Sequence, residues 1–333
     1  MGAGKGRSRR AQFANARALR TMSDRDFAGI LRRINVEEEL YDEEYEEAYD
    51  EFLHFQDIHG SKAFLASDRM NTQCAPERVW EGLGREVRPG EVPLDYQPNR
   101  LLGASNLALN VFDISQTRRK DSGMELAEYK AREEKALSCN DFLEKTIREL
   151  GLKLINVPSE KKHQVLRKNS KDLAKWEAET GVDAGRVNDW NWVFAETCLS
   201  GMNKDNVVAV DVGSAELNQP HLTPGEARAK VLAHELGHAL MNHCDDLYAL
   251  KEKHGAEEVS AIMSSEEFKM FEVEAELFSQ QVLERFGLAA TEKYTNSYIR
   301  SMNFINHYPT SQVRGAYERS KRAADEVLRD FQG

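Results

Sequence analysis

The chain has 333 residues, of which 41% are apolar, and this composition predicts ordinary hydrophobic cores in two domains. Its formal net charge of −11 argues against a surface that binds nucleic acid everywhere, so any such site must be local. No apolar run reaches the roughly 18 residues of a membrane span, which argues against a membrane partner. The four scattered cysteines form no CxxC pair, which predicts reduced thiols and a cytoplasmic protein.

The first 120 residues divide into a basic tail, an acidic helix and a region of short strands. We expect residues 1–36 to be a flexible basic extension, with a short helix that Ser23 or Asp24 caps. The pattern of residues 37–57 predicts an acidic amphipathic helix, because aromatic residues recur on one face. Glycines and prolines then separate short strands, one of them over 107–114, so we assign residues 37–120 to an N-terminal domain.

The middle of the chain predicts a domain boundary followed by alternating helix and strand. Residues 118–123 are polar, and we assign the linker to residues 121–137 and a second domain to residues 138–333. A helix is expected over 125–150 and strands over 152–157 and 206–212, whereas the charged residues 159–179 indicate an insertion. The strand over 206–212 is expected to form a sheet edge that receives an extended peptide, and the simpler interpretation is a plain core strand. The two roles are compatible, because an edge strand still packs one face.

The strongest chemical signal is the sequence HELGH over residues 234–238. Residues four apart share a helix face, so His234 and His238 can reach one zinc ion, and Glu235 is placed to activate water beside it. Thr223 is a good helix cap, and the apolar residues after it predict a helix through the motif. Gly237 lowers helix stability, which indicates a packing reason for its presence.

A catalytic zinc site needs a third protein ligand, and a second predicted helix that ends near Gly287 offers one. Glu272 and Glu276 are four residues apart and share a face, whereas Glu274 points about 200° away from Glu272. One of the face-sharing pair is expected to bind zinc, and the other to accept a hydrogen bond from a ligand histidine.

Two further helices, broken near Pro309, are predicted at the C-terminal end. Tyr298 or Tyr308 could donate a hydrogen bond to the oxyanion that forms during peptide hydrolysis, although either could instead be a packing residue. Cys244 lies close in sequence to the zinc motif and is an alternative ligand, although a partly buried thiol is the simpler interpretation.

The segment HELGHALMNH, followed by an E-x-E-A-E-x-F-S run, resembles the ImmA/IrrE-type zinc peptidases, a branch of the gluzincins. In that pattern Ala275 fixes the register, which implies Glu272 as the third ligand and Glu276 as the partner of a ligand histidine. Glu274 is the less favoured alternative. His243 matches a histidine that is frequent in this family, although a helix-end or packing residue is the simpler interpretation.

Two strings in the N-terminal half, WEGLGREVRPGE from Trp80 and VFDISQT from Val111, resemble the single-stranded-DNA-binding domain of ArdC-like antirestriction proteins. Such proteins join this domain to a C-terminal metallopeptidase. The resemblance implies base stacking and backbone contacts through Trp80, Arg85, Arg88 and Phe112.

Together these patterns predict an α+β protein with a small mixed DNA-binding domain and a minimal gluzincin-like peptidase domain. We expect a metalloendopeptidase with one Zn²⁺ per chain that cleaves a protein or peptide and binds single-stranded DNA in an antirestriction or mobile-element role. Two alternatives stay open. One is a non-proteolytic DNA-binding protein with a structural zinc, and the other is a peptidase that cleaves a repressor without binding DNA.

Overall fold

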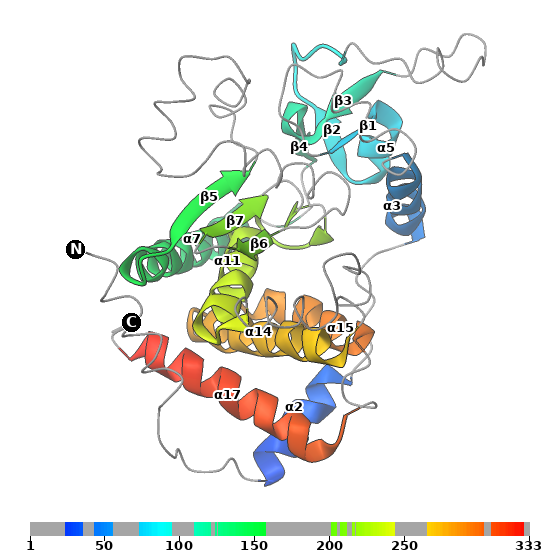
Figure 1. The fold of residues 1–333 in the computed structure, drawn as a ribbon. Helices are drawn as coiled ribbons and strands as arrows, with labels where there is room; N and C mark the ends of the chain where they lie inside the picture. The colour runs from blue at the N-terminus through cyan, green and yellow to red at the C-terminus, as the bar shows by residue number, and fades with distance from the viewer. Residues whose placement is uncertain are drawn as a thin grey trace.

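The structure, a computed structural model, shows a mostly helical protein with a few short strands, which confirms the α+β class (Figure 1). No helix among the residues it describes is long and apolar enough to cross a membrane. The described residues are 24–35, 43–55, 73–94, 110–120, 124, 126–157, 201–204, 207–211, 215–216, 218–243, 265–302 and 308–329.

A small module forms from residues between 43 and 120. It contains α3 (Glu43–Phe55), β1 (Cys74–Pro76), α5 (Glu77–Gly82), β2 (Arg85–Val87), β3 (Val111–Asp113), η2 (Ile114–Gln116) and β4 (Thr117–Arg119). Strands β1 and β3 pair antiparallel, as do β2 and β4. Phe52, Trp80 and Phe112 lie in its buried core, and the predicted acidic helix is therefore confirmed as α3 with its aromatic residues inward.

A three-stranded sheet lies beside the long helix α7 (Leu126–Glu149). Strand β7 (Val207–Asp211) is central, with β5 (Lys153–Val157) parallel on one side and β6 (Gly201–Lys204) antiparallel on the other. Among the described strands β7 is thus no sheet edge, and the edge alternative for residues 206–212 is wrong. Both neighbours occupy the hydrogen-bonding positions that an extended peptide would need.

The zinc motif lies on α11 (Pro224–Leu240), which packs against α7 and α14 (Glu266–Arg285). The Thr223 hydroxyl accepts a hydrogen bond from the Glu226 amide, and the Glu226 carboxylate accepts one from the Thr223 amide. The predicted capping box at the start of α11 is therefore confirmed. A Cβ on Gly237 would lie 3.1 Å from Ala275 Cα and 3.0 Å from Phe278 Cδ1. Gly237 therefore allows α11 and α14 to approach closely, which is the packing reason that its position implied.

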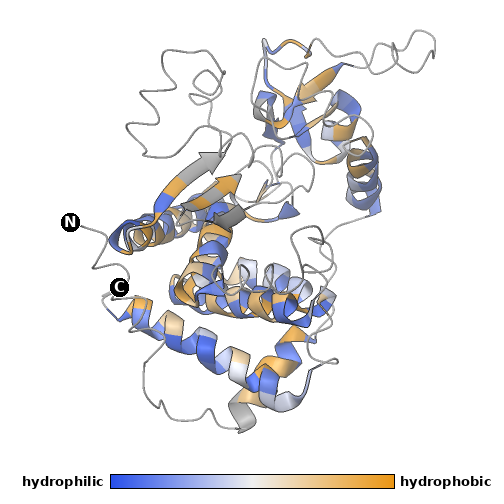
Figure 2. Ribbon diagram, in the orientation of Figure 1, coloured by the Kyte–Doolittle hydropathy of each residue, from blue (hydrophilic) through white to orange (hydrophobic). Residues whose placement is uncertain are grey.

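The C-terminal part consists of η3 (Ala289–Thr291), α15 (Glu292–Ser301) and α17 (Thr310–Leu328), and α17 begins directly after Pro309 as predicted. Helix α2 (Asp24–Ile34) packs on this region, because Phe27 and Ile30 are buried in one cluster with Val273 and Ile299. The short helix predicted within residues 1–36 is therefore present as α2. Figure 2 shows hydrophobic residues on β7 and a largely hydrophilic α17.

The segment assigned to the linker, residues 121–137, overlaps a helix, as the helix predicted over 125–150 does. Strand β4 extends to Arg119, and residues 126–137 form the first half of α7. Arg132 donates to both carboxylate oxygens of Glu226, which ties this half of α7 to the start of α11. The charged residues 159–179 and the cysteines Cys198 and Cys244 lie outside the described residues.

Two glycine substitutions in helices test the close approach of α11 and α14. Gly29→Ala in α2 meets open space and should stabilise the protein by about 1 kcal/mol, because alanine favours the helix. Gly237→Ala makes the same local gain but overpacks the helix contact, and should destabilise by about 1–3 kcal/mol. Urea unfolding of both variants measures the difference. Stabilisation by both substitutions would contradict the close contact.

Candidate metal centre

Three side chains from α11 and α14 converge in a partly buried cluster. His234 Nε2 lies 3.0 Å from His238 Nε2 and 3.3 Å from Glu272 Oε2, and His238 Nε2 lies 3.4 Å from Glu272 Oε1. A tetrahedral zinc ion with bonds of 2.0–2.1 Å separates its ligand atoms by about 3.3 Å. The donor atoms therefore already have the spacing of three zinc ligands, and their two imidazoles and one carboxylate are the donor types of a catalytic zinc site.

Glu276 contacts the cluster through His234. Its Oε1 lies 3.1 Å from His234 Nδ1, in a contact that is close but outside good hydrogen-bond geometry. Lys230 Nζ donates to both Glu276 oxygens at 2.8 and 2.9 Å, and the Thr295 hydroxyl donates at 2.8 Å. Burial raises the pKa of Glu276, but Lys230 and His234 outweigh it, so the pKa lies below its usual range. Glu276 is thus held as a carboxylate that faces Nδ1 of His234.

A second chain of contacts supports His238. Its Nδ1 lies 3.0 Å from His243 Nδ1, and His243 Nε2 lies 3.2 Å from Glu274 Oε2. Arg319 of α17 donates to the other oxygen of Glu274. Because Nε2 of His238 faces the cluster, its Nδ1–H is the proton that can be donated to His243, and His243 then donates Nε2–H to Glu274. This series of contacts through His243, Glu274 and Arg319 therefore fixes the orientation of the His238 ring.

Glu235 and Tyr298 complete the surroundings of the cluster. Glu235 is buried, and burial raises its pKa against the opposing effect of the nearby histidines. The Tyr298 hydroxyl donates to Glu272 Oε2 at 2.9 Å, and its ring meets that of His234 edge to face. A buried glutamate with a raised pKa and a tyrosine hydroxyl are both groups that can exchange a proton or hydrogen-bond with a reacting molecule.

The charges around the cluster favour a cation at its centre. Burial lowers the pKa of His234, but the carboxylates of Glu272 and Glu276 outweigh it and raise the pKa to about 10. Burial, and to a smaller extent the charge of His238, lowers the pKa of His243 to about 4 against the attraction of Glu274, which keeps that imidazole neutral. A site that attracts a proton this strongly attracts other cations for the same electrostatic reason.

The structure separates the two tyrosines that sequence reasoning left as alternatives. Tyr298 lies at the cluster, whereas the Tyr308 hydroxyl donates to the backbone carbonyl of Glu266 at 2.8 Å. Tyr308 is therefore a packing residue and not a stabiliser of the oxyanion. The third alternative ligand, Cys244, lies outside the described residues.

The residues expected to contact DNA need correction. Trp80 and Phe112 are core residues, and Trp80 Nε1 donates to the Phe112 carbonyl at 3.0 Å, so neither ring can stack on a base. Arg85 is also buried, and its guanidinium donates to Thr117 and to Glu216. Arg88 is exposed, and its assignment as a DNA contact stays a prediction.

Sequence reasoning missed Lys230, Thr295 and Arg319. Lys230 lies four residues before His234, so the helix period could have placed it on the same face. Thr295 and Arg319 come from α15 and α17, and no local pattern connects them to the motif. The sequence singles out His243 only through the family resemblance, and it makes Glu274 the less favoured alternative ligand because that residue points away from Glu272. It does point away, yet it reaches the cluster through His243.

Comparison with known proteins gave no match, because no family model, curated protein or solved structure is significantly similar to this chain.

The contact chain through His243 predicts an effect of Glu274 on metal affinity. Glu274→Gln removes the charge that faces His243 and Arg319, and should weaken zinc binding by about 10–100-fold, as the loss of an outer hydrogen-bond partner does. Competition with a chromophoric chelator measures the affinity. Glu267→Gln, an exposed position on the same helix, is the matched control and should leave it unchanged. A folded Glu274→Gln protein with the parent's affinity would show that the contact chain is irrelevant.

Proposed function

We propose that the protein is a zinc-dependent peptidase whose metal ligands are His234, His238 and Glu272. The observation that carries this proposal is the spacing of three donor atoms from two helices at the ligand separations of a tetrahedral zinc ion. On the same basis we assign the region after residue 138 to the gluzincin class, in which HExxH and a later helical glutamate supply the ligands.

Different residues would carry out the different steps of the proposed hydrolysis. Zinc, when bound, supplies Lewis-acid polarisation of a carbonyl and lowers the pKa of water. Glu235 follows His234 on α11, and its buried carboxylate would accept a proton from the attacking water and return it to the leaving amine. The Tyr298 hydroxyl, which donates to Glu272 at 2.9 Å, would stabilise the oxyanion once it releases Glu272.

The substrate class follows from the chemistry of the donor set and from the resemblance. A buried general base beside a zinc site suits hydrolysis of an unactivated amide, for which both polarisation and proton transfer are needed. We therefore propose a peptide bond in a protein partner, in an antirestriction or mobile-element setting.

The metal assignment is tested by substitution of one ligand. The purified chain should contain about one zinc ion, and His234→Ala should lose it, because two remaining donors hold the ion poorly. Elemental analysis by mass spectrometry measures the zinc content. His54→Ala, an exposed histidine on α3, should keep full content. Stoichiometric zinc in the His234→Ala protein would disprove the ligand set.

The role of Glu235 is tested without disturbing the metal. Glu235→Gln keeps the shape of the side chain but removes the base, so it should retain zinc and lose hydrolysis by at least about 100-fold, the usual contribution of general base catalysis. A casein or peptide-library assay with mass-spectrometric detection of cleavage measures the rate. Equal cleavage by the variant would show that Glu235 is not the base. Fully zinc-loaded parent protein that cleaves nothing would contradict the peptidase proposal.

A further inference from the structure

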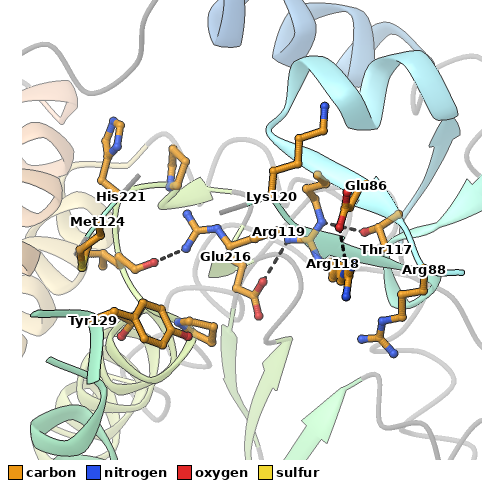
Figure 3. A pocket seen from close by; sticks show the side chains of 15 residues that line it. Glu86, Arg88, Thr117, Arg118, Arg119, Lys120, Met124, Tyr129, Glu216 and His221 are labelled. Carbon is orange, nitrogen blue, oxygen red and sulfur yellow. Dashed lines mark hydrogen bonds and ion pairs between the residues drawn. The ribbon is translucent and has the colours of Figure 1, made fainter. Parts of the chain in front are cut away.

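Cationic side chains hold α11 both at its beginning and beside the metal motif. Before the helix, Arg85 donates to Glu216 at 3.0 Å and Arg119 donates to the Leu222 carbonyl, contacts that Figure 3 draws as dashed lines. These contacts join the N-terminal module to the segment that leads into α11. Inside the helix, Lys230 is buried one turn before the first histidine of the motif. Its position therefore relates it to the metal centre rather than to the module.

Lys230 binds a carboxylate of the same type as the proposed ligand Glu272. Its Nζ donates to Glu276 Oε1 at 2.8 Å and to Oε2 at 2.9 Å. The two side chains are only 6% and 5% exposed, so the pair is shielded from water. The Thr295 hydroxyl also donates to Oε2, at 2.8 Å. Both oxygens of Glu276 are therefore held by donors of the protein itself.

Glu276 and Glu272 compete for the same cation. They lie one turn apart on the same face of α14. Glu272 Oε2 lies 3.3 Å from His234 Nε2, and Glu276 Oε1 lies 3.1 Å from Nδ1 of the same ring. The two carboxylates have the same chemistry and the same side-chain length. The helix period alone therefore does not decide which of them binds the metal.

The imidazole of His234 does not fix the position of Glu276. Their 3.1 Å contact lacks good hydrogen-bond geometry, and His234 Nδ1 has no hydrogen-bond partner among the described residues. The donors with good geometry are Lys230 and Thr295. Of these two, only Lys230 has a positive charge, so Lys230 is the donor that offsets the attraction of a carboxylate to a nearby metal cation.

We propose that Lys230 is a positioning residue that keeps Glu276 off the metal, so that one coordination position stays open for water. The inference rests on the proposed function, because it requires that the cluster bind zinc. Catalytic zinc sites have three protein ligands and an open fourth position, whereas structural sites are closed by four protein ligands. Lys230 thus determines whether the same two helices build an open site or a closed one.

The test replaces Lys230 by methionine, which is flexible, fills similar space and has no charge. The freed Glu276 should become a fourth protein ligand. Zinc affinity of the full-length Lys230→Met protein, measured by chelator competition, should therefore equal or exceed that of the parent. The loss of an ordinary outer hydrogen-bond partner would instead weaken it by about 10–100-fold.

Cobalt substitution shows directly whether a coordination position is open. The visible spectrum of the Co²⁺-loaded parent should change when azide is added, because azide enters the open position. The Lys230→Met spectrum should not respond to azide. Lys230→Arg, which keeps the charge, should respond as the parent does. Lys145→Met, at an exposed position on α7, is the matched control and should also respond as the parent does.

A double variant separates positioning from a general loss of stability. Lys230→Met/Glu276→Gln removes the competing carboxylate, so it should regain the azide response and bind zinc more weakly than Lys230→Met alone. Peptide hydrolysis should be lost in the single variant and partly regained in the double variant. A merely structural role of Lys230 predicts no such recovery, because the second substitution adds a further change to the same buried site.

Two results would overturn the proposal. One is a folded Lys230→Met protein that binds zinc more weakly than the parent and keeps the azide response. The other is a Lys230→Met protein that stays unfolded in excess zinc, by circular dichroism, while the double variant folds, because the freed carboxylate would then have found no metal. Absence of zinc from the parent would refute the proposed function instead. Affinity and spectra are read without any hydrolysis, so the two failures are distinct.

Discussion

The close contact of α11 with α14 is the constraint on which the rest of the site depends. His234 and His238 come from one helix and Glu272 from the other, so the three donors can meet only if the two helix axes approach closely. Gly237 lies between the histidines and makes room for the Ala275 backbone. The motif thus contains both proposed histidine ligands and the small residue that lets Glu272 come within reach of them.

The same contact buries charged groups that must then be neutralised. Alternate residues of α14 from Glu272 to Glu276 carry carboxylates, and all three are at least largely buried. An unpaired buried carboxylate is costly, so each one has a cationic or hydrogen-bonding partner. Glu276 is bonded by Lys230 and Thr295, and Glu274 is bonded by Arg319 and His243. Because Lys230, Thr295 and Arg319 come from α11, α15 and α17, the candidate metal centre links most of the helical region.

Much of this arrangement could be predicted from local sequence. The period of the α-helix places His234 beside His238 and Glu272 beside Glu276, and the Thr223 cap defines where α11 begins. Local patterns could not reveal Arg319, which lies 45 residues beyond its partner Glu274. They also could not reveal that α2 packs on α14 and α15, because a short amphipathic helix indicates a buried face but not its partner. Local patterns also could not reveal the burial of Trp80, because its neighbours Phe52 and Phe112 are distant in sequence.

The coordination of the metal itself tests the central claim most directly. X-ray absorption spectroscopy of the zinc-loaded, full-length protein should show only nitrogen and oxygen ligands at about 2.0–2.1 Å, with the multiple scattering of two imidazoles. Glu272→Ala should alter this spectrum by the loss of a protein oxygen. A sulfur ligand at about 2.3 Å, which Cys244 could supply, or a spectrum with fewer than two imidazoles, would contradict the ligand set of His234, His238 and Glu272.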